Sequence, residues 1–151
     1  MGEGRVRIRR SRRTDFTAVM SLLANSGVPV PPPERATLRR FRQVVADLGG
    51  DFYLGAVDGA LVGLVHVTYA RQLARPPCAR LDQLVVADGF RRRGIGSALV
   101  AFAQRRARQR GCAVLACTLP AAADAAAREF LRKAGLTVSG EHFIQPLRDE
   151  G

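Results

Sequence analysis

The spacing of apolar residues switches between two periods along the chain, and the order of the switches predicts a mixed α/β protein. Val6 and Ile8 alternate with arginines, which is the period of a strand with one polar face. Phe16, Val19 and Leu23 then recur at the spacing of one helical face. The same reasoning predicts strands over 51–57, 61–69, 81–86 and 112–118, one or two more over 136–147, and helices over 34–48, 95–110 and 120–133.

Two connections carry clear local signals. Asp58-Gly59 between two of the predicted strands is typical of a tight hairpin turn. Segment 26–33 contains four prolines, which exclude a helix or a central strand there. This segment is either a plain connector or a rim of a substrate pocket, because binding sites often use loops held on a rigid scaffold.

The stretch from Leu81 to Arg110 is the one best suited to chemistry. A basic turn punctuated by glycines, residues 91–97, lies between an apolar strand and an amphipathic helix. The first amides of a helix have no partner inside the helix and carry partial positive charge, so they bind phosphate well. Gly94 and Gly96 remove Cβ atoms that would keep a ligand from the backbone. The stretch therefore predicts a pocket for a phosphorylated cofactor, and the competing interpretation of its arginines is solvated surface charge.

Composition narrows the classes of partner. The net charge of +11 is compatible with a nucleic acid or a membrane surface. The arginines are nevertheless spread along the whole chain, and no RNA-binding signature with interleaved aromatics occurs, so no specific nucleic-acid partner is predicted. No apolar run is long enough to span a membrane, and the charged N-terminus does not resemble a signal peptide. We expect a cytoplasmic protein with one compact domain over residues 1–151.

The three cysteines, Cys78, Cys112 and Cys117, do not form a recognisable framework. Their number is odd and none of them has C-x-x-C spacing. The sequence thus predicts neither disulfides nor a metal site.

At residues 91–97 the sequence resembles a known family. Arg91-x-x-Gly94-x-Gly96 resembles the acetyl-CoA pyrophosphate motif of the GNAT superfamily of N-acetyltransferases, and it lies in the strand-turn-helix context that the motif requires. Segments 7–15 and 55–63 look like the family's first strand and helix and its central hairpin. Ala127-x-x-Phe130-x-x-x-x-Gly135-Leu136 looks like its late helix.

The resemblance implies a single-domain GNAT-like fold of the α/β (α+β) class. Such a fold has a mixed central sheet, here expected to hold six to seven strands flanked by about four helices. Two of its strands splay apart and hold the cofactor between them.

The same resemblance implies that the cofactor is acetyl-CoA, held by two groups of residues. Free backbone groups of the strand would contact the pantetheine arm, at Leu84, Val85 and Val86. The turn and the first helical residues would hold the pyrophosphate, at Arg91, Arg92, Arg93, Gly94, Ile95, Gly96 and Ser97. The implied reaction is direct transfer of acetyl from the thioester to an amine, with the Val86 amide as the candidate donor to the thioester carbonyl.

Attack by an amine needs a base, since most amines are protonated at neutral pH. Asp82 is the leading candidate because it lies two residues before Leu84, on the same face of a regular strand, although an ion pair with an arginine is an equally good interpretation. His66 is the second candidate because its ordinary pKa lies near neutrality, yet a lone histidine among apolar residues is more often structural. Tyr69 is a candidate for orienting substrate or donating a proton.

The chain departs from the family pattern at the general acid. Many members have a tyrosine directly after the phenylalanine matched by Phe130, and this chain has Leu131 there. Asp124 replaces an asparagine often found earlier on the same helix. The leaving thiolate must therefore be protonated by another donor, such as Tyr69 or water, or leave unassisted.

The sequence thus leads to an acetyl-CoA-dependent N-acetyltransferase that acts on a primary amine, expected to belong to a small molecule. Two alternatives remain: acetylation of a protein or peptide, and a non-catalytic acyl-CoA-binding regulatory module, which the missing tyrosine suggests. The terminal strand can also mediate a homodimer by edge pairing. The sequence does not identify the acceptor.

Overall fold

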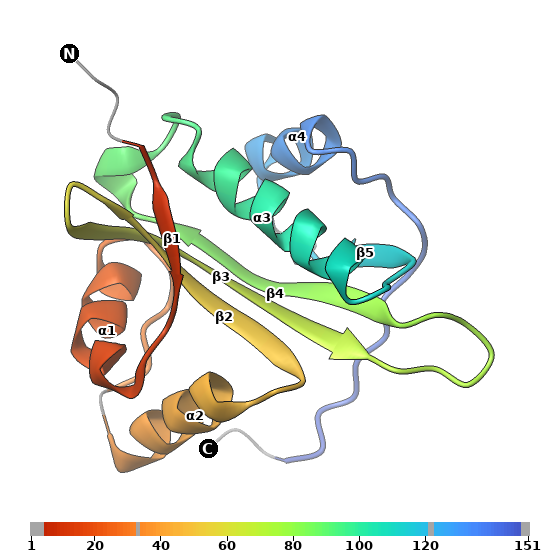
Figure 1. The fold of residues 1–151 in the computed structure, drawn as a ribbon, viewed down its shortest axis with the longest axis horizontal. Coiled ribbons are helices and arrows are strands. Elements are labelled where there is room, and N and C mark those ends of the chain that lie inside the picture. The colour runs from red at the N-terminus through yellow and green to blue at the C-terminus, as the bar shows by residue number, and fades with distance from the viewer. Residues whose placement is uncertain (1–4, 33, 121–122, 149–151) are drawn as a thin grey trace. The chain divides into compact units, whose positions relative to one another are not determined.

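The computed structural model describes residues 5–32, 34–120 and 123–148. They belong to two compact units, Met1–Cys117 and Thr118–Gly151. The first unit contains a mixed sheet of strand order β1-β2-β3-β4-β5, in which β1 to β4 are antiparallel and β5 is parallel to β4 (Figure 1). Its strands are β1 Arg7–Arg10, β2 Gly50–Val57, β3 Ala60–Ala70, β4 Cys78–Val86 and β5 Val114–Cys117. Its helices are α1 Phe16–Ala24, α2 Arg35–Ala46 and α3 Ile95–Gln109, with short 3-10 helices at Arg13–Asp15 and Asp88–Phe90.

The two faces of this sheet carry different helices. Helices α1 and α2 pack on one face, where Phe41 contributes to a core cluster with Phe52 and Leu64. Helix α3 packs on β3 and β4 from the other face and buries Leu99 and Ala103. The fold class expected from the sequence is confirmed: α1, α2 and α3 each bury side chains against a face of the mixed sheet. None of the described helices is long and apolar enough to cross a lipid bilayer.

The second unit differs from the sequence prediction. Its helix α4, Ala125–Lys133, begins later than the expected Pro120, because the Asp124 carboxylate caps it by accepting the Ala127 N–H at 2.9 Å. The described residues after α4 form no strand, so the sheet has five strands instead of six or seven. In this segment large apolar side chains are 78–87% exposed, at Val138, Phe143, Ile144 and Leu147. Without a partner edge or burial, alternation alone does not form a strand. A single domain over residues 1–151 stays a prediction.

The hairpin between β2 and β3 forms as expected. Asp58 and Gly59 both have positive φ, 49° and 80°, which is the geometry of a type I′ turn. The turn and a bulge at Val62 together set the register that brings Gly63 of β3 beneath the first turn of α3, because the pairing passes from Leu61 opposite Ala56 directly to Gly63 opposite Gly55. A Cβ on Gly63 would lie 2.9 Å from Leu99 Cδ1 and 3.1 Å from the Val85 carbonyl oxygen. Glycine therefore permits the close approach of α3 to the sheet.

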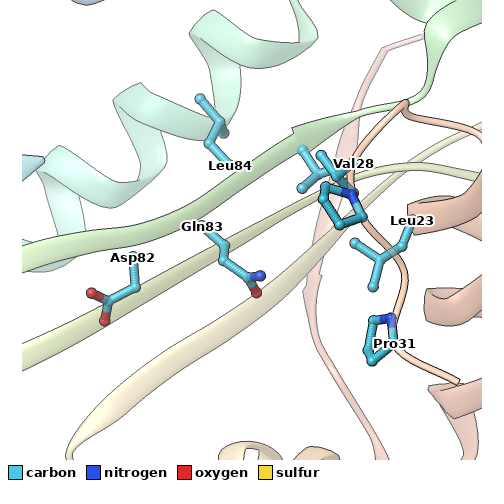
Figure 2. Close-up of a pocket in the computed structure, with 8 residues that line it drawn as sticks. Leu23, Val28, Pro31, Asp82, Gln83 and Leu84 are labelled. Carbon is cyan, nitrogen blue, oxygen red and sulfur yellow. The ribbon is translucent and has the colours of Figure 1, made fainter. Parts of the chain in front are cut away.

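Strand β4 contains a bulge at Asp82. Its register with β3 passes from Leu81 opposite Val67 directly to Gln83 opposite His66, so Asp82 is the extra residue. The bulge changes which side chains share a face: Asp82 and Gln83 point to one side of the strand and Leu84 to the other (Figure 2). The expectation that Asp82 and Leu84 share a face is wrong, because alternation holds only in a regular strand.

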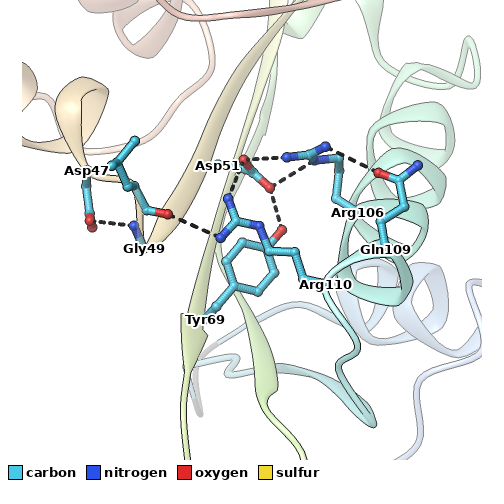
Figure 3. Close-up of polar contacts among 8 residues, drawn as sticks. Asp47, Gly49, Asp51, Tyr69, Arg106, Gln109 and Arg110 are labelled. Carbon is cyan, nitrogen blue, oxygen red and sulfur yellow. Dashed lines mark hydrogen bonds and ion pairs between the residues drawn. The ribbon is translucent and has the colours of Figure 1, made fainter.

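A buried carboxylate ties the C-terminal half of α3 to β2 and β3 (Figure 3). Asp51, whose side chain is 1% exposed, accepts hydrogen bonds from the Tyr69 hydroxyl at 2.6 Å and from Arg106 Nε at 3.0 Å. Arg110 pairs with the same carboxylate at 3.3 Å, and its guanidinium lies over the Tyr69 ring. Burial alone would raise the pKa of Asp51, but the hydrogen bonds from Arg106 and Tyr69 and the two arginine charges hold that pKa below its usual value.

We expect Gly63→Ala to lower the free energy of unfolding by roughly 1–3 kcal/mol, since the added methyl overlaps Leu99 and the β4 backbone. Gly89→Ala is the control, because a Cβ there meets nothing within 4 Å and the residue lies outside the left-handed region. Urea unfolding of both variants measures the difference. Equal stability of the two would contradict the close packing.

We expect Asp51→Asn to lower the free energy of unfolding at pH 7 by about 3 kcal/mol, because it leaves two guanidinium groups without their carboxylate. The pKa of Asp51 is lower in the folded than in the unfolded chain, so its contribution is complete above about pH 4 and is lost as the pH falls through the folded-state pKa. Urea unfolding from pH 7 to pH 3 should therefore show the two proteins converging. The exposed Asp58→Asn is the control, and a pH-independent gap would contradict the assignment.

Candidate active site

The outer edge of β4 has no described partner strand beyond the point where β5 ends. The two strands pair only from Cys78 to Leu81 on β4, and in the described part of the chain no strand pairs with residues 82–86 on that side. On its other side, β4 remains paired with β3 as far as Val86. β5 ends at Cys117, opposite Leu81, so the space beside the outer edge of residues 82–86, called the gap below, is where the sequence analysis expects the two strands to splay.

The hydrogen-bond phase of β4 decides which backbone groups face this gap. The Ala87 N–H donates to the Val62 carbonyl at 2.9 Å, which makes that pair a hydrogen-bonded one. Because such pairs alternate along antiparallel strands, Leu84 and Val86 point their N–H and C=O groups away from β3, toward the gap. Val85 points its backbone groups to β3 and buries its side chain, so it does not offer the free groups that the sequence analysis assigned to it.

The turn before α3 has the conformation of an anion cradle. Arg92 and Gly94 have positive φ, 62° and 78°, and Gly94 is the N-cap of α3. Ile95 buries its side chain and anchors the first turn, while Ser97 is exposed. The amides of Ile95, Gly96 and Ser97 belong to the first turn and therefore have no acceptor within the helix. Alternating backbone handedness next to such amides is typical of anion-binding concavities.

The three arginines of the turn have different roles. Arg91 donates to the Ser26 carbonyl at 2.6 Å and pairs with Asp88 at 3.1 Å, so it fastens the turn to the end of α1. Arg93 lies over the Phe90 ring, 5.1 Å from its centroid. In the described part of the chain no carboxylate pairs with Arg92 or Arg93, and both remain exposed at the start of α3.

These donors suit the parts of acetyl-CoA. First-turn amides and exposed guanidinium groups match the charge of a pyrophosphate. An open strand edge with alternating N–H and C=O groups matches the amides of a pantetheine arm, which can pair with it as a short strand does. The residues present therefore fit the cofactor that the sequence predicts.

A pocket of about 470 Å³ lies beside the bulge in β4 (Figure 2). Residues 82–85 form its floor. Its walls come from the end of α1 and the proline segment, at Leu23, Val28, Pro29 and Pro31. Of the two interpretations of the proline segment, the structure favours the pocket rim. The segment is also fixed to α2, because the Thr37 hydroxyl donates to the Pro32 carbonyl at 2.9 Å.

The structure brings Asp82 and His66 to one face of the sheet. The Asp82 carboxylate accepts hydrogen bonds from the Thr68 hydroxyl and from Arg80, the latter at 3.1 Å, and is 24% exposed. His66 lies two residues before Thr68 and packs edge-on against Phe52 at 5.3 Å. Burial lowers the pKa of His66 below its ordinary value, and the charges of Asp82 and Asp47 only partly oppose this.

Tyr69 is separated from these two residues. Strand alternation places it on the face that carries α3, where its hydroxyl donates to Asp51. Burial raises the pKa of Tyr69 well above its ordinary value, and the Asp51 hydrogen bond adds to this effect. Its hydroxyl is thus committed to the Asp51 carboxylate, away from the pocket.

Sequence reasoning missed two residues of the site, Thr68 and Arg80. Alternation along the strand places Thr68 on the face of His66, and this signal was available. The contacts of both residues with Asp82 follow from the β3–β4 register, which no local pattern specifies. Among the described residues, no group of three or more His, Cys, Asp or Glu could hold a metal ion.

Comparison with known proteins agrees with this geometry. Residues 9–136 match the model of the acetyltransferase (GNAT) family. No curated protein sequence matches the chain. Among solved structures, a transcriptional regulator from Bacillus halodurans C-125 is 23% identical, with a TM-score of 0.85 over 95% of this chain and 100% of that chain.

Two solved acetyltransferases also share the fold. An aminoglycoside N-acetyltransferase in complex with CoA is 18% identical, with a TM-score of 0.81 over 97% of each chain. Glucosamine-6-phosphate N-acetyltransferase from Arabidopsis thaliana is 15% identical, with a TM-score of 0.80 over 95% of this chain and 99% of that one. At these identities the likeness establishes the fold, while the family model covers most of the chain. The protein therefore belongs to the GNAT family and is an acetyl-CoA-dependent acetyltransferase.

Proposed function

We propose that this protein transfers acetyl from acetyl-CoA to a primary amine of a small molecule. The observation that carries the proposal is that β4 contributes to both parts of the site. Its free backbone groups point to the gap, and its residues 82–85 form the floor of the pocket. The same strand then leads into the turn before α3. Cofactor and acceptor would thus meet at residues 82–86. Acetyl-CoA, when bound, supplies the acetyl group as an activated thioester.

The residues proposed to bind the cofactor belong to β4 and to the first turn of α3, whose backbones are fixed by regular secondary structure. The first-turn amides of α3, with Arg92 and Arg93, would hold the pyrophosphate, and Leu84 would pair with the pantetheine arm. The Val86 N–H points into the gap and would donate to the thioester carbonyl oxygen as negative charge develops there. Arg91 positions the turn through Ser26.

On the acceptor side we assign the base to Asp82. Its carboxylate lies at the pocket, remains partly exposed and keeps lone pairs beyond those used by Thr68 and Arg80. There it would accept a proton from the incoming ammonium group, directly or through water. His66 is the second candidate: its lowered pKa keeps the imidazole neutral at pH 7, but its ring packs against Phe52 in place of lining the pocket.

The leaving thiolate lacks the family's usual acid. Leu131 carries no proton donor, and the Tyr69 hydroxyl donates to Asp51 on the opposite face of the sheet. Protonation by water, after departure of the thiolate, needs neither side chain. A small-molecule acceptor is supported by two relatives of the same fold, which are named for acetylating an aminoglycoside and glucosamine 6-phosphate.

Gly96→Glu should weaken acetyl-CoA binding at least 100-fold, because it places a bulky anion among the amides that hold the pyrophosphate. Isothermal titration with CoA measures the change. Gly140→Glu adds the same charge at an open position outside the left-handed region and should leave affinity unchanged. Unaltered CoA binding by Gly96→Glu would refute the cofactor assignment.

Asp82→Asn should reduce kcat roughly 100-fold or more at pH 7 without changing CoA affinity, since it removes the base and keeps the side-chain shape. His66→Gln should retain most of the activity. Thiol release at saturating acetyl-CoA, followed from pH 5 to pH 9, separates the two assignments. With His66 as the base, wild-type kcat would fall as the pH drops through a pKa below 6.5, and His66→Gln would lose that limb.

A further inference from the structure

We infer that the acceptor is a monoamine with an apolar body, aliphatic or aromatic, and that it lies against the proline segment. This inference rests on the proposed function and specifies its substrate class. It follows from the composition of the pocket at Asp82, from the charge around that carboxylate and from the charge of the whole chain.

The pocket is mostly apolar. Among the described residues that line it, Leu23, Val28, Pro29 and Pro31 form an apolar wall from the end of α1 and the proline segment. Leu84 belongs to the floor, but its side chain points to the other face of β4. The polar lining is confined to Asp82 and Gln83, neighbours at the bulge. A site built for a polyhydroxylated sugar needs many hydrogen-bond partners, because each hydroxyl left unpaired on binding costs free energy. This lining offers few partners and a large apolar wall, which suits a hydrocarbon body.

The electrostatics limit the number of positive charges on the acceptor. Among the described residues, Asp82 supplies the one carboxylate of the lining, and the Arg80 guanidinium lies 3.1 Å from it. The carboxylate can orient a single ammonium group, but Arg80 already offsets its charge. The chain as a whole carries +11, so long-range repulsion opposes a polycation further. An acceptor with one ammonium group is compatible with this positive electrostatic potential, and an acceptor with several is not.

The proline segment, which forms the apolar wall of the pocket, is held in place by hydrogen bonds at both of its ends. Pro32 accepts hydrogen bonds from the Glu34 N–H at 2.7 Å and from the Thr37 hydroxyl, which join the segment to α2. At its other end, the Ser26 hydroxyl donates to the Leu23 carbonyl at 2.8 Å, closing the end of α1. A fixed proline loop adds little entropy cost when an apolar ligand binds against it.

The test is an amine series assayed by thiol release with saturating acetyl-CoA. Ethylamine, butylamine, hexylamine and 2-phenylethylamine extend the apolar body, while kanamycin and glucosamine 6-phosphate represent polycationic and anionic polar amines. We expect kcat/KM to rise about fourfold for each methylene that the wall buries. We expect both polar amines to react at least 100-fold more slowly than hexylamine.

A matched pair of variants locates the apolar contact. Val28 lines the pocket, whereas Val30, two residues along and 40% exposed, does not. Val28→Ser should reduce kcat/KM for hexylamine about tenfold and for ethylamine by a much smaller factor, and Val30→Ser should change neither. Val28→Thr keeps the shape of valine and repeats the test if serine perturbs the loop, which thermal unfolding reports.

The outcomes distinguish failure of the apolar substrate class from failure of the proposed acetyltransferase function. A preference for kanamycin or glucosamine 6-phosphate over hexylamine, or turnover confined to peptide amines, overturns the apolar class alone. Binding of acetyl-CoA without turnover of any amine in the series also overturns that class. Failure to bind acetyl-CoA overturns the proposed function itself. Equal effects of Val28→Ser and Val30→Ser would remove the proline segment from the acceptor site.

Discussion

The pairing of β4 is the constraint on which the rest of the structure depends. One edge of this strand is paired with β3 from Cys78 to Val86, interrupted only by the bulge at Asp82, while the other edge has no partner strand after Leu81 among the described residues. The first edge fixes the phase of the backbone, and the second leaves the outward N–H and C=O groups of Leu84 and Val86 available. Unpaired strand edges usually invite aggregation, and here the edge is short and matches the cofactor that the family uses.

The bulge at Asp82 changes which side chains of β4 lie on each face of the sheet. Before it, Leu81 packs toward α3, and after it Leu84 takes that face while Asp82 and Gln83 turn to the pocket. An apolar strand thereby places a carboxylate beside free backbone groups without burying it. Thr68 and Arg80 orient that carboxylate, so the candidate base is held by hydrogen bonds instead of by packing.

Helix α3 must be held rigidly, because its first turn is the proposed anion site. At its N-terminal end Gly63 lets Leu99 approach the sheet, and at its C-terminal end Asp51 binds Arg106 and Arg110. Tyr69 belongs to this second anchor, so its hydroxyl lies on the opposite face of the sheet from the pocket although the residue follows Thr68 directly in sequence. Amides fixed in advance stabilise charge at little reorganisation cost.

The sequence by itself determined the layers and the cofactor. Apolar periodicity, the Asp58-Gly59 turn and the Arg91-x-x-Gly94-x-Gly96 motif are local signals, and local conformation follows from them directly. Only the tertiary structure decided that the backbone N–H and C=O groups of Val85 point toward β3 and that the side chains of Asp82 and Leu84 lie on opposite faces of the strand. It alone also decided that the Tyr69 hydroxyl donates to Asp51. It also decided that residues 136–147 form no strand among the described residues. Each of these depends on register or on a partner distant in sequence, and one residue of slip reverses every side chain of a strand.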